Sequence, residues 1–250
     1  MIPRVIARLD IKGEKIIKGI QLDGLKEVGN PNKFALKYFK DGIDEIFLVD
    51  IVASLYGRNS LINVIRSSAK NIFIPIIVGG GIRSEENAYE ILKNGADKIS
   101  LNTAAVNNPK LITKISKRFG SQCVTVTLEV NKVDENKWEV FTHNGTKRSN
   151  LEVKDWIKKV IDLGAGEIIL NSIEKDGTKN GFDLDLINES KEICKVPFII
   201  SGGLAKLDHI KELDLKGIDG ICSGTALHYN LLKITEIKKI LKKKCIKHIL

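Results

Sequence analysis

Short runs of β-branched and apolar residues alternate along the chain with longer segments whose apolar residues recur at the spacing of an amphipathic helix. Eight runs are predicted strands, at 4–10, 45–51, 74–78, 98–101, 123–130, 167–173, 196–200 and 220–224. Predicted helices include 84–95, 108–120, 151–164 and 184–193, several preceded by a Ser, Asn or Asp that can cap them and several ended by Gly. Eight strand–helix units in 250 residues favour an α/β fold of the (β/α)8 TIM-barrel type over an open doubly wound sheet.

Long connections interrupt this alternation in two places, and both are predicted loops. One covers 11–30 after the first strand, and the other covers 131–150 after the fifth. Within the second loop, 137–145 alternates like a small β-hairpin.

The chain also repeats itself. At an offset of 122 positions, Pro75 falls on Pro197, Gly42 on Gly164 and Asp97 on Asp219, and at an offset of 119 Asp10 falls on Glu129. We therefore expect a single domain, 1–250, built from two half-barrels of about 1–120 and 121–250.

The repeat carries two glycine turns, in "PIIVGGGIRS" (75–84) and "PFIISGGLAK" (197–206). Glycines between a strand and a helix let unpaired backbone N–H groups approach a phosphate, at the barrel face where active sites form. The exits of the fourth and eighth strands add Asn102, Thr103, Gly224 and Thr225 as further donors. Glycines also serve tight turns without any ligand, but the symmetric recurrence favours a substrate with a phosphate at each end.

Two carboxylates are predicted to lie between these turns. Asp10 and Glu129 end the first and fifth strands on opposite sides of the barrel, as a general acid and a general base over a substrate would. The alternative is that each caps a loop or pairs with a nearby lysine such as Lys18.

Net charge and cysteine content add little chemistry. The net charge is +9, and seven lysines lie between 233 and 247 in a predicted last helix, where a solvated outer face is favoured over a nucleic-acid patch. The four cysteines are widely spaced without a zinc pattern, so reduced thiols, no metal and no cofactor are expected. No apolar run suits a membrane span or a signal peptide, which predicts a cytoplasmic protein.

Taken together, several motifs resemble one known family across essentially the whole chain. They are "ARLDIK", "VDIVAS", "VGGGIRS", "GADKISLNTAAVNNPKLI", "FGSQCVTVTLEV", "GAGEIILNSIEKDGTKNGFD" and "SGGLAK". The chain resembles the cyclase subunit of imidazole glycerol phosphate synthase, a lyase of histidine biosynthesis, more than the related aminoaldose isomerase.

The resemblance implies a heterodimer with a glutaminase, a class I glutamine amidotransferase, whose ammonia passes through the barrel. The ammonia would react with a bis-phosphorylated ribulosyl aminoimidazole carboxamide to give imidazole glycerol phosphate and an aminoimidazole carboxamide ribotide. The catalytic residues would be Asp10 and Glu129, with Lys18 on a mobile first loop that closes over substrate. Substrate and its phosphates would contact Lys18, Asp50, Gly80, Gly81, Asn102, Thr103, Asn171, Asp176, Gly177, Ser201, Gly202, Gly203, Gly224 and Thr225. Ammonia would enter through a charged ring of Arg4, Glu45, Lys98 and Glu167, whose alternative is a structural ion-pair cluster.

Some residues depart from the family pattern. Glu129 replaces the usual aspartate, and alternation turns Arg8 into the barrel below Asp10, where the family has a small residue. A buried guanidinium needs a partner, and Glu129 is its candidate. Asn144, Asn171 and Glu174 differ as well.

These departures leave two alternatives to the cyclase open. One is a paralogue that channels ammonia for amidation of a sugar in surface-polysaccharide biosynthesis, without cyclase activity. The other is a different phosphosugar isomerase or lyase.

Overall fold

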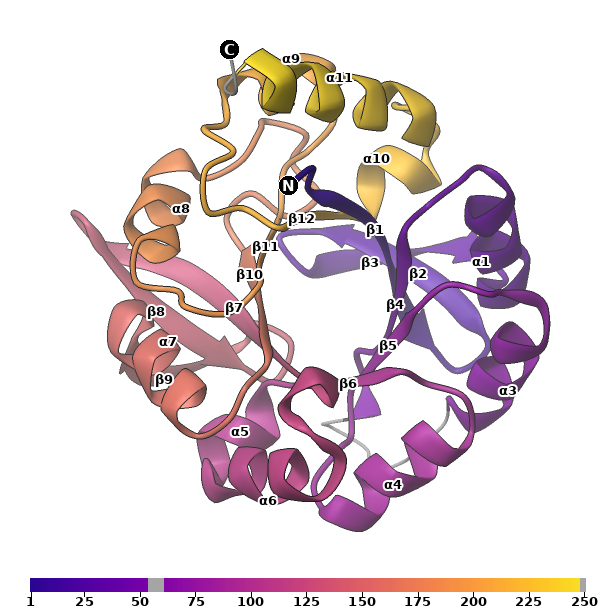
Figure 1. Ribbon diagram of the computed structural model, residues 1–250, viewed down its shortest axis with the longest axis vertical. Coiled ribbons are helices and arrows are strands. Elements are labelled where there is room, and N and C mark those ends of the chain that lie inside the picture. Colours follow the sequence, from indigo (N-terminus) through magenta and orange to yellow (C-terminus); the bar gives the residue numbers. More distant parts are fainter. Residues whose placement is uncertain (54–60, 248–250) are drawn as a thin grey trace.

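The computed structural model describes residues 1–53 and 61–247. Ser54, which ends the "VDIVAS" motif, and residues 248–250 of the predicted last helix lie outside the described residues. Eight parallel strands form a closed barrel inside a ring of helices, seen end-on in Figure 1. The predicted (β/α)8 TIM barrel is therefore confirmed.

All eight predicted barrel strands are present. They are β1 (Arg4–Lys12), β4 (Glu45–Asp50), β5 (Ile76–Gly79), β6 (Lys98–Leu101), β7 (Val124–Asp134), β10 (Glu167–Ser172), β11 (Phe198–Ser201) and β12 (Gly220–Ser223). Each strand pairs in parallel with its neighbours in the order β10, β11, β12, β1, β4, β5, β6, β7, and the pairing of β7 with β10 closes the cylinder.

Helices cover the outside of the barrel. They are α1 (Pro31–Lys40), α3 (Ile62–Asn71), α4 (Glu85–Lys93), α5 (Thr103–Asn107), α6 (Lys110–Phe119), α7 (Val153–Asp162), α8 (Leu184–Lys191), α9 (Leu207–Glu212), α10 (Thr225–His228) and α11 (Ile234–Lys247), with a short 3-10 turn at Ser121–Cys123. Caps predicted from the sequence are made where Ser84 accepts from the Asn87 N–H and Asp183 accepts from the Leu186 N–H.

The prediction of a long loop over 11–30 is wrong. This segment forms β2 (Lys15–Ile20) and β3 (Asp23–Gly29), an antiparallel hairpin that continues from β1. Its two-residue turn consists of Gln21 and Leu22, both at positive φ. The hairpin predicted within 137–145 is confirmed, and its strands are β8 (Lys137–Thr142) and β9 (Lys147–Glu152).

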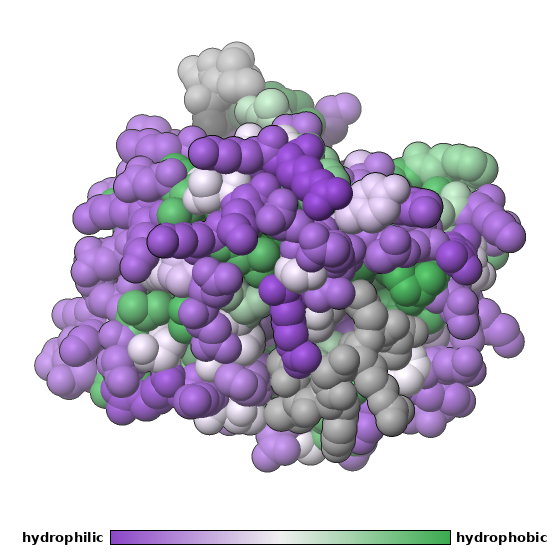
Figure 2. Space-filling model, turned by 90° about the horizontal axis from the view of Figure 1, so that it is seen from below, coloured by the Kyte–Doolittle hydropathy of each residue, from purple (hydrophilic) through white to green (hydrophobic). Residues whose placement is uncertain are grey.

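Two apolar layers hold the barrel together. The larger lies between the strands and the helices, and the smaller fills the inside of the barrel with Ile6, Phe47, Ile77, Ile169, Ile199 and Cys222. The face in Figure 2 is mostly hydrophilic, with apolar side chains in small separate areas. On α11, Ile237 and Leu241 are buried whereas Lys239 and Lys242 are exposed, as predicted for a solvated outer face.

Candidate functional site

The two glycine turns lie at the C-terminal ends of β5 and β11. Gly80 and Gly203 both have positive φ, at 94° and 91°. A Cβ at Gly80 would lie 2.2 Å from the Asp50 carbonyl oxygen, and one at Gly203 would lie 1.8 Å from that of Gly181. These close approaches exclude any side chain, so both turns require glycine.

A cavity of about 310 Å³ opens beside the first turn. The predicted site residues on its walls are Asp50, Gly80, Gly81, Asn102, Thr103 and Glu129, and Arg8 reaches it as well. The Thr103 hydroxyl accepts a hydrogen bond from the His143 N–H at 3.0 Å, which joins the turn after β8 to this wall.

The second turn lines a much smaller space of about 10 Å³. Its walls contain the predicted residues Lys18, Asp176, Gly177, Ser201, Gly202, Gly203, Gly224 and Thr225, together with Arg8. The β2–β3 hairpin narrows this space, because Lys18 reaches into it and the Gln21 N–H donates to the Asp176 carbonyl at 2.7 Å. Within the described residues, the buried Thr225 hydroxyl has no hydrogen-bond partner.

Between the two turns, six buried side chains form a closed ring of contacts, here named the central cluster: Arg8, Asp10, Lys18, Asp176, Asn171 and Glu129. Arg8 Nε donates to Asp10 at 2.7 Å, and Arg8 Nη2 donates to Glu129 at 3.1 Å. Lys18 bridges Asp10 at 2.9 Å and Asp176 at 2.7 Å. The Asn171 amide completes the ring by donating to Glu129 at 2.6 Å and to Asp176 at 3.3 Å.

Charge pairing in the central cluster fixes its protonation. Burial alone would raise the pKa of Asp10, but Arg8 and Lys18 outweigh it and hold that pKa well below its usual range. Burial opposes the charge of Lys18 too, yet Asp10 and Asp176 raise its pKa. The pKa of Arg8 is raised well above its usual value in the same way, against its own desolvation.

The expected contact between Arg8 and Glu129 is confirmed. Asp10 makes the contact with Lys18 that was the alternative to a free acid or base. The expectation that Lys18 lies on a mobile loop is wrong, because it lies within β2 and only 5% of its surface is exposed.

Sequence reasoning missed some polar side chains of the first cavity. Ser100 and Thr127 face each other on its wall with their hydroxyls 2.6 Å apart. Strand alternation could have found them, since Ser100 lies two residues before Asn102 and Thr127 two before Glu129.

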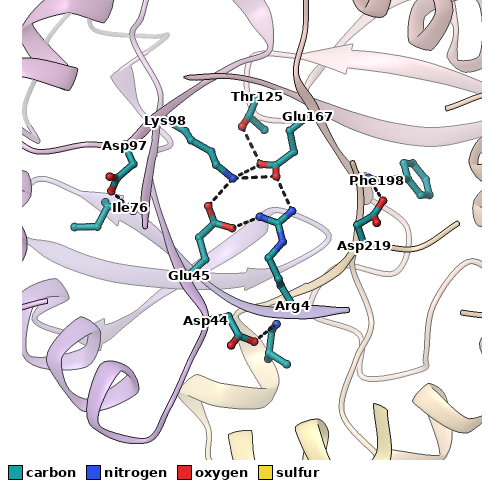
Figure 3. Close-up of polar contacts among 11 residues, drawn as sticks. Arg4, Asp44, Glu45, Ile76, Asp97, Lys98, Thr125, Glu167, Phe198 and Asp219 are labelled. Carbon is teal, nitrogen blue, oxygen red and sulfur yellow. Dashed lines mark hydrogen bonds and ion pairs between the residues drawn. The ribbon is translucent and has the colours of Figure 1, made fainter. Parts of the chain in front are cut away.

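At the opposite, N-terminal end of the barrel, four charged side chains form an alternating ring, named the entrance ring (Figure 3). Arg4 donates to Glu45 at 2.9 Å and to Glu167 at 2.7 Å, and Lys98 contacts the same two carboxylates at 2.8 Å and 3.0 Å. The Thr125 hydroxyl also donates to Glu167. The pKa of Glu45 is raised, because burial and the neighbouring Glu167 outweigh Lys98 and Arg4.

Equivalent contacts recur in the two halves at this end. The Asp97 carboxylate accepts from the Ile76 N–H at 2.8 Å, and the Asp219 carboxylate accepts from the Phe198 N–H at 2.9 Å (Figure 3). Both residues of each pair are related by the offset of 122 positions seen in the sequence.

Two further findings concern the part of the chain that the structure describes. No group of three or more His, Cys, Asp or Glu side chains there is placed to hold a metal ion. None of the helices in that part is both long and apolar enough to span a membrane.

Comparison with known proteins identifies the relatives of this barrel. The model of the family described as "Histidine biosynthesis protein" matches residues 4–233. The chain belongs to this family.

Relatives within the histidine biosynthesis protein family share one name, imidazole glycerol phosphate synthase subunit HisF. A Legionella pneumophila protein of that name is 50% identical over 205 residues, which is 82% of this chain and 97% of the relative. One from Sulfurisphaera tokodaii is 43% identical over 241 residues, or 96% of both chains. One from Corynebacterium glutamicum is 39% identical over 245 residues, or 96% of this chain and 95% of the relative.

Proposed function

We propose that the chain is the ammonia-dependent cyclase subunit of an imidazole glycerol phosphate synthase. Its substrate is a bis-phosphorylated ribulosyl aminoimidazole carboxamide, and its products are imidazole glycerol phosphate and an aminoimidazole carboxamide ribotide. The observation that carries the proposal is the placement of Asp10 and Glu129 in one cluster between two glycine turns. The common name of the relatives supports it.

Each turn holds one phosphate in this proposal. Gly80, Gly81, Asn102 and Thr103 bind the first, and Gly202, Gly203, Gly224 and Thr225 bind the second. Backbone N–H groups at the starts of the short helices after β6 and β12 suit an anion. The unpartnered Thr225 hydroxyl supports the second site, because a phosphate oxygen would give it a partner.

Ammonia reaches this site from the other end of the barrel. The entrance ring is closed by four ion pairs, so Lys98 or Arg4 must move before anything enters. Above the ring, the apolar layer that includes Ile6 and Phe47 favours neutral ammonia over the ammonium ion, which would lose its hydration there.

A glutaminase partner docks at the same end in this proposal. Phe73 has 79% of its surface exposed there, beside a hollow of about 340 Å³ that it lines together with Asp97. An exposed aromatic side chain next to a hollow is typical of protein–protein contacts.

Arg8 favours a second candidate function, the conduction of ammonia to a separate sugar-amidating enzyme without cyclisation. Because its guanidinium contacts both Asp10 and Glu129, each carboxylate is held charged and is a poor proton donor. Under this candidate the barrel and its entrance ring remain in use, and the carboxylates do not.

One experiment separates the two candidates. The pure chain is given the bis-phosphorylated substrate and an ammonium salt at alkaline pH, and imidazole formation is followed. Turnover supports the cyclase, and its absence removes it. The double variant Arg8→Cys with Glu129→Asp is the control, because it frees Asp10 and shortens the second carboxylate. Activity that appears only in the double variant identifies Arg8 and Glu129 as the reason for the loss.

A further inference from the structure

The cavity beside the first glycine turn keeps one hydrogen-bond donor and one acceptor without partners. Arg8 is only 1% exposed, and its Nη1 has no partner among the described residues although its other two nitrogens are bonded. The buried Oδ1 of Asn102 likewise has no partner in the described chain. Each unmade hydrogen bond of this kind costs about 1–3 kcal/mol.

Both groups line the same cavity, of about 310 Å³. Arg8 is held firmly in place there, because its Nε and Nη2 are bonded and its guanidinium lies 5.9 Å from the centre of the Phe47 ring. Asn102 directly follows β6 and precedes Thr103, the first residue of α5. A small ligand group in this cavity can therefore meet a fixed donor and a fixed acceptor together.

The charge of the central cluster selects the kind of group. Two cations, Arg8 and Lys18, face three carboxylates, those of Asp10, Glu129 and Asp176. An additional anion would increase the negative excess in a buried place, whereas a neutral oxygen accepts from Arg8 without changing the charge. The unpaired acceptor on Asn102 asks in turn for an N–H or O–H group.

We propose that Arg8 and Asn102 together bind a neutral amide group of the ligand, whose carbonyl accepts from Arg8 Nη1 and whose N–H donates to Asn102 Oδ1. Arg8 is then a specificity-determining residue. The ligand class is a phosphorylated molecule that carries a carboxamide or an acylated amine. The inference rests on the proposed function only in placing the ligand's phosphate at the first glycine turn, and it holds for either candidate activity.

The test uses small probes and no turnover. The full-length chain, labelled with nitrogen-15, is titrated with acetamide, acetone or sodium acetate in phosphate buffer, while the side-chain resonances of Arg8 and Asn102 are followed by NMR. Acetamide is expected to saturate both at a concentration about tenfold lower than acetone, which lacks the N–H group. Acetate is expected to bind more weakly than acetamide. The proposal is overturned if acetate binds more tightly than acetamide, or if acetamide moves neither resonance.

Variants give a second readout. Asn102→Leu removes the acceptor away from the ion pairs and is expected to bring acetamide to the level of acetone, whereas Asn102→Asp keeps an acceptor oxygen and retains the difference. Arg8→Lys keeps the charge but loses the fixed geometry and is expected to weaken acetamide binding. Unchanged acetamide selectivity in Asn102→Leu overturns the proposal. Because neither ammonia nor substrate is present, failure here is distinct from failure in the turnover assay.

Discussion

A guanidinium inside a barrel is stable only where its charge is matched, and Arg8 meets that condition with two carboxylates. Asp10 and Glu129 lie within hydrogen-bond distance of it, at 2.7 Å and 3.1 Å. Removal of the cation would leave them and Asp176 buried with Lys18 alone. The site therefore depends on Arg8 for its charge balance as well as for its shape.

Arg8→Met tests this dependence. The variant is expected to lower the free energy of unfolding by about 3–5 kcal/mol, because it leaves a buried carboxylate without its cation. Urea unfolding at neutral pH measures the change. Arg148→Met is the matched control, since Arg148 makes two hydrogen bonds to Glu139 but is itself exposed, and a much smaller change is expected there. Equal changes in the two variants would contradict the argument.

His228 predicts a distinct pH dependence. Its Nδ1 lies 2.7 Å from the Tyr38 hydroxyl, and burial, with the nearby Lys18, lowers its pKa from 6.5 to about 4. The unfolded chain therefore binds more protons than the folded chain between these values, so stability falls as the pH falls through this range. The expected loss from pH 7 to pH 4.5 is roughly 2–3 kcal/mol.

The measurement compares urea unfolding of the wild type with that of His228→Gln at both pH values. The variant keeps a polar partner for Tyr38 but does not titrate, so its stability should change less with pH. An identical pH dependence in both proteins would show that His228 does not contribute.

Much of the site could be predicted from residue patterns, but its contacts could not. Alternation along β1 placed Arg8 in the barrel and suggested its contact with Glu129, which the structure has. The additional bond from Arg8 to Asp10 joins two residues on one face of the same strand, and it depends on side-chain rotamers that a pattern does not specify. The bridging position of Asn171 likewise follows from the pairing of β7 with β10.

Among the elements, the β2–β3 hairpin shows why a fold prediction can be right in outline and wrong locally. Two-residue hairpin turns usually carry Asn or Gly, which tolerate positive φ. Here Gln21 and Leu22 occupy the turn, at φ values of 53° and 64°, so the sequence gave no turn signal. The eight barrel strands had strong apolar patterns and were found, and so was the β8–β9 hairpin, whose turn contains Asn144 and Gly145.

The hairpin is held over the second glycine turn by a close backbone contact. A Cβ at Gly177 would lie 2.3 Å from the Gly19 carbonyl oxygen. Gly177→Ala is therefore expected to push the hairpin away, to cost about 1–3 kcal/mol, and to speed amide hydrogen exchange in 15–29. Gly24→Ala is the control, because Gly24 also has positive φ but has nothing within 4 Å of its Cβ position. Equal exchange in 15–29 for both variants would contradict the role of the contact.

At the scale of the whole molecule, the two ends of the barrel serve different partners. The entrance ring and the exposed Phe73 lie at the N-terminal end, and the central cluster lies toward the other. Asp97 is less suitable for a charge-reversal test than Lys98, because its carboxylate accepts from the Ile76 N–H and supports the start of β5.

Lys98→Glu is expected to weaken binding of the partner glutaminase at least about tenfold, measured by calorimetry, because it breaks the entrance ring and reverses a charge at the docking face. Lys154→Glu is the control, since Lys154 pairs with Glu189 on the outer helices. Phe73→Ser supplies a second variant if Lys98→Glu unfolds. Full affinity in both docking-face variants would contradict the proposed interface.

The duplicated halves do not contribute equally to the central cluster. Its two cations, Arg8 and Lys18, both come from the first half, and the position related to Arg8 by the offset of 119 is Thr127. A molecule with two similar ends would otherwise have two equivalent orientations across a two-fold repeat. The uneven distribution of positive charge removes that degeneracy, so a ligand binds with a single polarity and presents the same atom to each half in every encounter.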